Sequence, residues 1–492
     1  MKTLAVILLP MLCAAADAPA AIDALLDAAR AAPAEFAADA IIRIAALDQL
    51  EKARRIELLE QAFQRASGAQ QPYKRHAAFV RPDTPSGFFN RAYGLDLDAM
   101  SLRLRAIEAL LPLDAQKARD LFLQTPPPKT PPLKCDDFLI YDVGRFYDTL
   151  GSLARQSFTA QEVQAGAPFR LLERFAGAIA SPVQVAPVAR MLAASSVKDA
   201  DFRALVNSFA AALGKISGDD RSFAYSTQAG QQILALVEES KRRQLSPLPL
   251  LEAYRLYLVD NLSAARCADD DSMMGNTFSF GMVSGQAVDR EDQDTAGFFN
   301  KRLRLAPLQP IQEEESTPVR LEGVATVLRM CEDAECRAIA EQCRGLAFGE
   351  NGSPYTASQK NAPAWRAKVR DFLAALSRWQ QSAPGAHPTA AEHFREKSAA
   401  YSDLLNLVFN GPDRDVVARA MLHYLKQSPF QRENRLEWFL PVSALIGRVV
   451  LDPVGMGRVA EELRNADDPA IALYANLERV APRTPDRILP LL

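Results

Sequence analysis

Apolar residues recur every three or four positions along almost the whole chain. Residues 102–111 illustrate the pattern, because leucine, alanine and isoleucine are separated there by arginine and glutamate. This spacing places the apolar side chains on one face of a helix. The same periodicity is found at 22–29, 41–47, 56–63, 169–179, 202–216, 233–237, 250–262, 365–376, 404–409, 416–425 and 471–480. Convincing strand-like alternation is absent, and its nearest case, 277–283, contains a glycine that favours a loop or a single hairpin arm. We therefore expect an all-α protein.

Aspartates stand in front of several of the predicted helices. A carboxylate at this position accepts hydrogen bonds from the first backbone amides, which have no partner inside the helix. The pattern predicts that Asp48, Asp114, Asp452 and Asp468 are N-caps.

Two proline-rich segments divide the predicted helices into groups. Residues 125–134 contain five prolines, and 305–318 contain three prolines and an acidic triplet. Proline runs favour the extended polyproline form and exclude helix. We therefore predict linkers at 125–134 and 305–318, which separate helical domains at 19–124, 135–304 and 319–492.

One helix pair has a repeat-like sequence. Arg105-Ala106-Ile107-Glu108-Ala109-Leu110-Leu111 is followed by Ala118-Arg119-Asp120-Leu121-Phe122. This unit, and the helical pattern over most of the chain, resembles helix-pair repeat proteins such as tetratricopeptide and HEAT-type arrays of exported bacterial proteins. No unit carries the full tetratricopeptide series, so the repeat type stays open. The resemblance implies an α-solenoid or tandem helical-repeat domains that present a concave binding surface.

The N-terminus has the three parts of a secretion signal. Lys2 precedes an apolar run at 4–12, and a tract of small residues follows at 14–18. This order predicts a cleaved bacterial-type signal peptide at 1–18 and a periplasmic or extracellular location. Lipid attachment at Cys13 is not expected, because the residue before it is Leu12 rather than a small one. We expect no membrane span in the mature chain, because every later apolar run is too short.

Composition and charge are those of an ordinary soluble protein. Of the 492 residues 48% are hydrophobic and 24% are charged, and the formal net charge is -3. A near-neutral balance gives no electrostatic basis for binding nucleic acid. We therefore expect no nucleic-acid partner.

Five cysteines remain after removal of the leader, and an oxidising compartment would allow disulfides. Cys135 and Cys267 have similar acidic contexts, and we pair them first as a candidate disulfide. Cys336 and Cys343 would lie about 10 Å apart on one helix, which is too far for a bond. Cys331 could instead bond Cys336 across a helix end.

Motifs for catalysis, metals or cofactors are missing. The four histidines, His76, His387, His393 and His423, do not form the i, i+4 pair of a helix-borne metal site. Neither a phosphate-binding glycine loop nor a nucleophile elbow occurs. We expect no metal and no cofactor.

A pair of phenylalanines occurs twice in similar contexts. Phe88-Phe89 lies in 83–91, and Phe298-Phe299 lies in 294–301, where the flanking residues are similar. One interpretation is an aromatic plug buried between helices. The other is that these four rings are exposed contacts for a partner.

These observations favour a binding or scaffold protein over an enzyme. We expect an exported helical-repeat protein that binds another protein or an envelope component. The alternative is a hydrolase of an envelope polymer such as murein, using carboxylates in a helical groove, and Glu108 and Glu252 are examples. A catalytic carboxylate should be desolvated in a cleft with a raised pKa, whereas a binding groove should expose aromatics and amides.

Overall fold

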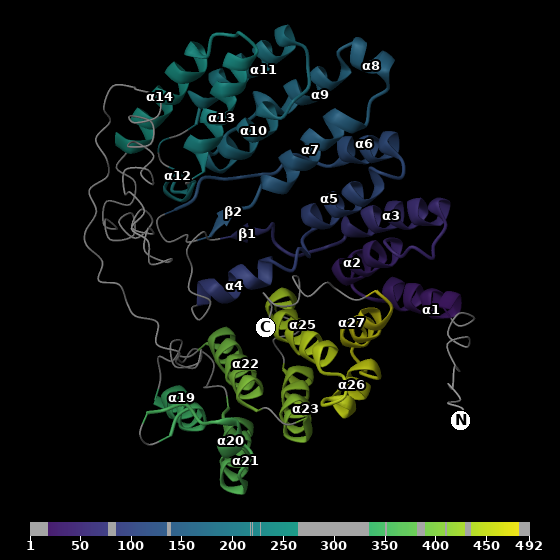
Figure 1. The fold of residues 1–492 in the computed structure, drawn as a ribbon, viewed down its shortest axis with the longest axis vertical. Coiled ribbons are helices and arrows are strands. Elements are labelled where there is room, and N and C mark those ends of the chain that lie inside the picture. The colour runs from purple at the N-terminus through teal and green to yellow at the C-terminus, as the bar shows by residue number, and fades with distance from the viewer. Residues whose placement is uncertain are drawn as a thin grey trace, which may run out of the picture. The chain divides into compact units, whose positions relative to one another are not determined.

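The chain is mostly helical and forms two compact units (Figure 1). Unit 1 combines Met1–Gln71 with Gly323–Leu492, and unit 2 is Pro72–Glu322. The computed structural model describes residues 18–76, 85–134, 139–216, 218, 220–226, 228–263, 334–349, 352–380, 389–408, 411–428 and 434–481. All statements about structure below concern these residues.

Unit 2 consists of helices and one very small sheet. Strands β1 and β2 pair antiparallel, with Arg75 opposite Tyr141 and His76 opposite Ile140. The strands are β1 (Arg75–His76) and β2 (Ile140–Tyr141). The helices are α4 (Pro85–Tyr93), α5 (Ala99–Leu110), α6 (Ala115–Gln124), α7 (Gly144–Gln156), α8 (Ala160–Gln164), α9 (Ala167–Ala176), the 3₁₀ turn η1 (Pro182–Gln184), α10 (Val185–Ala193), α11 (Asp199–Leu213), α12 (Ser222–Tyr225), α13 (Ala229–Arg242) and α14 (Leu248–Ser263).

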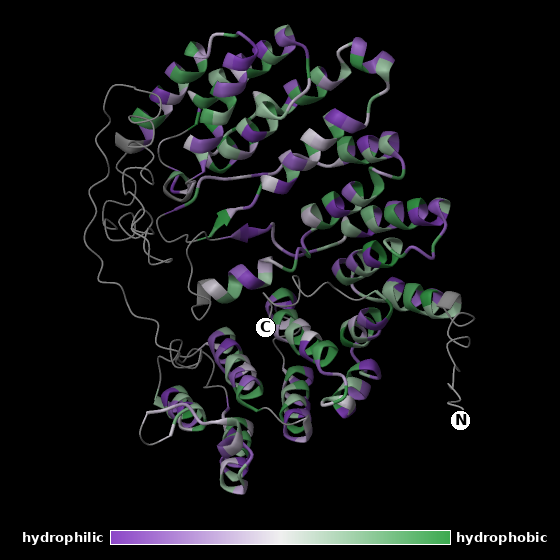
Figure 2. Ribbon diagram, viewed as in Figure 1, coloured by the Kyte–Doolittle hydropathy of each residue, from purple (hydrophilic) through white to green (hydrophobic). Residues whose placement is uncertain are grey.

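Helices of unit 2 pack against partners a few elements along the chain. Helix α7 contacts α9 and α10, and α11 contacts α9 and α14. The rings of Phe122, Phe146 and Phe175 form one aromatic cluster, with centroids 5.0 to 6.0 Å apart. Most of these helices carry both hydrophobic and hydrophilic residues (Figure 2), and longer ones such as α9 and α11 bury one side and expose another.

Unit 1 joins the first helices of the chain to the last ones. Its elements are α1 (Ala18–Ala31), α2 (Ala34–Ala45), α3 (Lys52–Ala66), α19 (Ala334–Ala347), α20 (Ala357–Lys360), α21 (Pro363–Arg378), α22 (Ala390–Leu407), α23 (Gly411–Gln427), α25 (Arg435–Leu451), α26 (Gly457–Arg464) and α27 (Pro469–Val480). Helices α1 and α2 pack against α27. The ring of Phe36 lies 4.6 Å from that of Phe439, and the Tyr474 hydroxyl donates to the Asp39 carboxylate at 2.6 Å. Buried aromatic and polar contacts therefore connect segments more than 400 residues apart.

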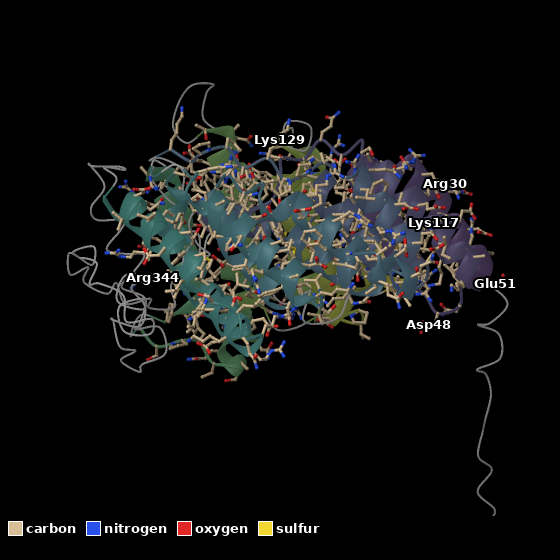
Figure 3. All side chains as sticks on the ribbon, turned by 90° about the horizontal axis from the view of Figure 1, so that it is seen from above. Arg30, Asp48, Glu51, Lys117, Lys129 and Arg344 are labelled. Atoms are coloured by element: carbon tan, nitrogen blue, oxygen red, sulfur yellow. The ribbon has the colours of Figure 1, made fainter. Side chains whose placement is uncertain are left out.

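A buried ion pair crosses the interior of unit 1. Arg395 of α22 donates to Glu437 of α25 at 2.9 Å, and the two side chains are 10% and 2% exposed. Burial raises the pKa of Glu437 above its ordinary value, and Arg395 opposes that shift. In contrast, charged residues such as Asp48, Glu51 and Lys129 are exposed (Figure 3).

The all-α expectation is confirmed for the described residues, apart from the four residues of the small sheet. Asp114 and Asp468 cap α6 and α27 as predicted. Two predicted caps are wrong. Helix α3 begins after Glu51 rather than Asp48, and Asp452 follows α25, where it accepts from the amide of Gly455 at 3.0 Å.

The predictions for the leader and the domain boundaries stay predictions. The apolar run of the leader and the linker at 305–318 lie outside the described residues, as does the segment 277–283. Residues 125–134 carry no helix or strand, and they lie within unit 2.

Candidate functional site

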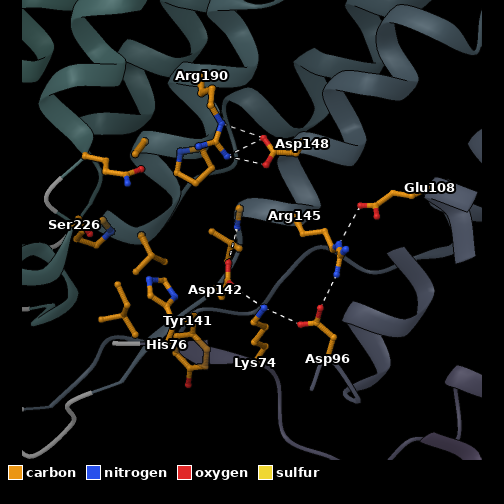
Figure 4. A pocket seen from close by; sticks show the side chains of 18 residues that line it. Lys74, His76, Asp96, Glu108, Tyr141, Asp142, Arg145, Asp148, Arg190 and Ser226 are labelled. Atoms are coloured by element: carbon orange, nitrogen blue, oxygen red, sulfur yellow. Dashed lines mark hydrogen bonds and ion pairs between the residues drawn. The ribbon is translucent and has the colours of Figure 1, made fainter. Parts of the chain in front are cut away.

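A pocket of about 600 Å³ lies within unit 2, and seven of the eighteen residues that line it are charged (Figure 4). Its residues come from the small sheet and the positions beside it, from the turn before α5, from α5, α7, η1 and α10, and from the connection between α12 and α13. Cavities of roughly 300–1,000 Å³ are typical of small-molecule sites. The volume therefore suits a small ligand.

The sheet fixes one side of the pocket. The amide of Asp142 donates to the carbonyl of Lys74 at 3.1 Å, and the Tyr73 hydroxyl donates to the carbonyl of Asp142 at 2.8 Å. The guanidinium of Arg75 lies 4.6 Å from the centre of the Tyr141 ring and donates to its hydroxyl at 2.9 Å. These bonds hold Lys74, Tyr141 and Asp142 in place beside the cavity.

Five of the pocket side chains form a continuous series of ion pairs in which negative and positive charges alternate. Arg145 of α7 donates to Glu108 of α5 at 3.2 Å and to Asp96 at 2.8 Å. Lys74 contacts the other oxygen of Asp96 at 2.7 Å and reaches Asp142 at 3.2 Å. Burial acts to lower the pKa of Lys74, but Asp96 and Asp142 outweigh it and raise that pKa above its ordinary value. Every charged side chain in this series is therefore held in place by its neighbours before any ligand binds.

Asp96 lies at the centre of this series of ion pairs. Its backbone has a conformation that residues other than glycine rarely adopt. Its φ is 56°, in the left-handed region. Non-glycine residues in that region cost energy, and they cluster at functional sites. The backbone thus places one carboxylate between two cations.

The left-handed position of Asp96 can be tested by substitution. Asp96→Ala is expected to be less stable than Asp96→Gly by about 1 kcal/mol, because glycine adopts a positive φ without steric cost. Asp96→Asn is the matched control, since asparagine tolerates this conformation. Urea unfolding followed by circular dichroism measures the three variants. Equal stability of the alanine and glycine variants would show that residue 96 is not left-handed in solution.

A second ion pair and an apolar wall complete the pocket. Arg190 of α10 donates to both oxygens of Asp148, at 2.8 and 2.9 Å. The pocket is also lined by apolar residues of η1 and α10, namely Val183, Ala186 and Pro187. The pocket therefore has an apolar side as well as a charged one.

His76 lines the pocket, and burial favours the uncharged form of its imidazole. Its Nδ1 is buried and has no hydrogen-bond partner among the described residues. Burial lowers the pKa of His76, Asp142 opposes the shift and Lys74 adds to it. A neutral imidazole offers both a donor and an acceptor to a ligand.

Buried hydrogen bonds support the apolar wall from behind. The Asp220 carboxylate accepts from the Ser181 hydroxyl at 2.7 Å, and from the amides of Ser222 and Leu133 at 2.9 and 3.1 Å. Gln184 donates to the Tyr147 hydroxyl at 2.8 Å. These bonds fix η1, which carries Val183 into the pocket wall.

Among the carboxylates named from the sequence, only Glu108 lies in the pocket. Glu252 is exposed on α14. Phe88 is buried and Phe89 is half-buried on α4, and neither lines the pocket. Their role as partner contacts stays a prediction. Phe298, Phe299, Cys135 and Cys267 lie outside the described residues.

The cysteines of α19 differ in state. Cys336 is disulfide-bonded, whereas Cys343 is a buried free thiol. This agrees with the geometric argument that these two cannot bond each other. Burial, with a further contribution from Asp403, raises the pKa of Cys343.

Sequence reasoning missed Lys74, Asp96, Arg145 and Arg190 as site residues. They are spread over more than 100 positions and belong to no motif. The one sequence feature that could have pointed to this pocket was His76, because the chain has only four histidines. Nothing in the sequence indicated which arginines the fold would bring to it.

The described residues contain no cluster of three or more His, Cys, Asp or Glu side chains that could hold a metal ion. Of the described helices, none has both the length and the apolar character needed to cross a membrane. Comparisons of the chain with protein-family models, with curated proteins and with solved structures found no match.

Proposed function

We propose that this chain is an exported binding protein and that the pocket of unit 2 holds its ligand. The observation that most supports this proposal is the set of ion-paired side chains around a cavity of about 600 Å³. Charges fixed in advance by ion pairs lose little freedom on binding, which favours affinity and selectivity. The stacked helices of unit 2 support its interpretation as a helical-repeat array.

Two features support export. The leader has a basic start, an apolar run and a small-residue exit. Cys336 is disulfide-bonded, and such bonds persist mainly in oxidising compartments.

The pocket geometry favours binding over hydrolysis. A glycosidase needs one carboxyl group that can donate a proton to the leaving group. Asp96, Asp142 and Asp148 each face a cation, and Glu108 accepts from both Arg145 and the Thr149 hydroxyl, the latter at 2.7 Å. This arrangement suits recognition of a ligand better than proton transfer to it.

Arg145→Gln is expected to remove a small molecule that copurifies with the native protein. Without Arg145, Asp96 and Glu108 lose a shared cation, so the preset geometry of the pocket is lost, and ligand affinity should fall about 10-fold or more. Protein purified from its natural compartment is denatured, and the released compounds are compared by mass spectrometry.

The matched control is Arg242→Gln, which changes an exposed arginine on α13 that does not line the pocket. It should retain the compound. A compound retained equally by both variants would contradict the assignment of the pocket. Incubation with murein tests the alternative, and release of soluble fragments would favour a hydrolase.

A further inference from the structure

The hydrogen-bond capacity left over in the pocket indicates which ligand it takes. Arg145 uses Nε and Nη1 for its carboxylate partners, and Arg190 uses Nε and Nη2. Within the described part of the chain, this leaves Nη2 of Arg145 and Nη1 of Arg190 without acceptors. Both open groups suit an anionic oxygen.

One carboxylate oxygen is open as well. Both oxygens of Asp96, Asp142 and Asp148 accept a hydrogen bond or face a cation. Glu108 uses only Oε1, which accepts from Arg145 and Thr149. Its Oε2 therefore has no donor among the described residues, and it suits an ammonium group.

The charge balance of the lining disfavours a simple anion, and the open guanidinium donors disfavour a simple cation. The lining holds three cations, Lys74, Arg145 and Arg190, against four carboxylates, and burial favours the neutral form of His76. A simple anion would add to the excess of negative charge. A simple cation would leave the open guanidinium donors of Arg145 and Arg190 without an acceptor.

We propose that the pocket binds a zwitterion with an apolar portion, such as a short peptide with free ends. Its ammonium lies at Oε2 of Glu108, its carboxylate lies at the guanidinium of Arg190, and its apolar part lies against Val183 and Pro187. This inference rests on the proposed function, because it assigns a ligand class to the same pocket. Such a ligand satisfies the open Oε2 of Glu108 and the open Nη1 of Arg190, and it leaves the charge of the site unchanged.

The test uses tripeptides that differ only at their ends. The full chain is dialysed to equilibrium against an equimolar library of tripeptides with free ends, and against the same library N-acetylated, C-amidated or blocked at both ends. Bound peptides are quantified by mass spectrometry. A subset of the free peptides should bind, and blocking either end should weaken binding about 10-fold.

Two variants assign the ends. Glu108→Gln should abolish the preference for the free amino end and keep the preference for the free carboxylate. Arg190→Gln should do the reverse. Glu238→Gln and Arg242→Gln, which change exposed side chains of α13, should keep both preferences.

The outcomes separate this inference from the proposed function. If blocked peptides bind as well as free ones, or if no free peptide binds, the zwitterion assignment is overturned. Chitotriose is included as a neutral glycan. Its retention by the native protein and loss in Arg145→Gln would overturn the zwitterion while keeping the pocket as a binding site. If neither the probes nor a copurified compound depends on Arg145, both proposals fail.

Discussion

Replacing Asp220 with alanine is expected to lower the free energy of unfolding by about 3–5 kcal/mol. Asp220 is only 2% exposed, and its carboxylate accepts three hydrogen bonds, from Ser181, Ser222 and Leu133. Alanine would leave the amides of Ser222 and Leu133 buried without an acceptor, and Ser181 would keep only the Ser222 hydroxyl, 3.3 Å away. Each buried amide without an acceptor carries its own desolvation penalty. The loss is therefore larger than that of a surface aspartate.

Urea unfolding followed by circular dichroism measures this effect. Asp120→Ala is the matched control, since Asp120 is exposed on α6, and its change should stay within about 0.5 kcal/mol. Ligand binding by the Asp220→Ala protein should also weaken, because Ser181 precedes η1 in the pocket wall. Equal stability of the two variants would show that the Asp220 network does not hold unit 2 together.

Arg395→Met is expected to destabilise unit 1 by about 3–5 kcal/mol near neutral pH. The substitution leaves Glu437, whose side chain is 2% exposed, without its cation. A buried charge with no partner is far more costly than a buried ion pair. Removing both charges, as Arg395→Met with Glu437→Leu, should recover most of the lost stability.

The pH dependence of this variant follows from the direction of the Glu437 shift. Burial raises the pKa of Glu437 in the folded protein, so the folded state binds a proton more tightly than the unfolded state. The protonated Glu437 therefore favours folding at low pH. This contribution to the free energy of unfolding is lost as the pH rises from the ordinary pKa of 4.5 through the higher pKa of the folded state. The destabilisation by Arg395→Met should accordingly be smaller at pH 5 than at pH 7.

Tryptophan fluorescence is the suitable readout, because all three tryptophans of the chain, Trp365, Trp379 and Trp438, belong to unit 1. Arg419→Met is the control. It removes an exposed partner of Glu462, both side chains being 43% exposed, and should cost less than about 1 kcal/mol. A loss that is the same at both pH values would argue against an uncompensated Glu437 charge as its cause.

The sequence predicted those features of the structure that depend only on neighbouring residues. Periodicity located helices such as α5 and α11, because burial of one face is written into the spacing of their apolar residues. Capping by Asp114 and Asp468 was also predictable. It was wrong at Asp48, because the helix begins three residues later, after Glu51, and at Asp452, which ends a helix.

The candidate site was not predictable in the same way. Glu108 appeared in the sequence as one exposed acid among many, and only its bonds to Arg145 and Thr149 separate it from Glu252. Asp96 gave no signal, since a positive φ depends on the turn that surrounds it. Ion pairs between residues tens of positions apart leave no periodic trace in a sequence.

The sequence by itself determined that the chain folds mainly into helices, because side-chain spacing along a helix is a property of neighbouring residues. Only the tertiary structure decided that Phe36 and Asp39 pack with Tyr474, and that Lys74, Asp96 and Arg145 meet beside one cavity. Those contacts depend on how helices stack. Stacking is selected by the summed packing of many side chains, which no single segment encodes.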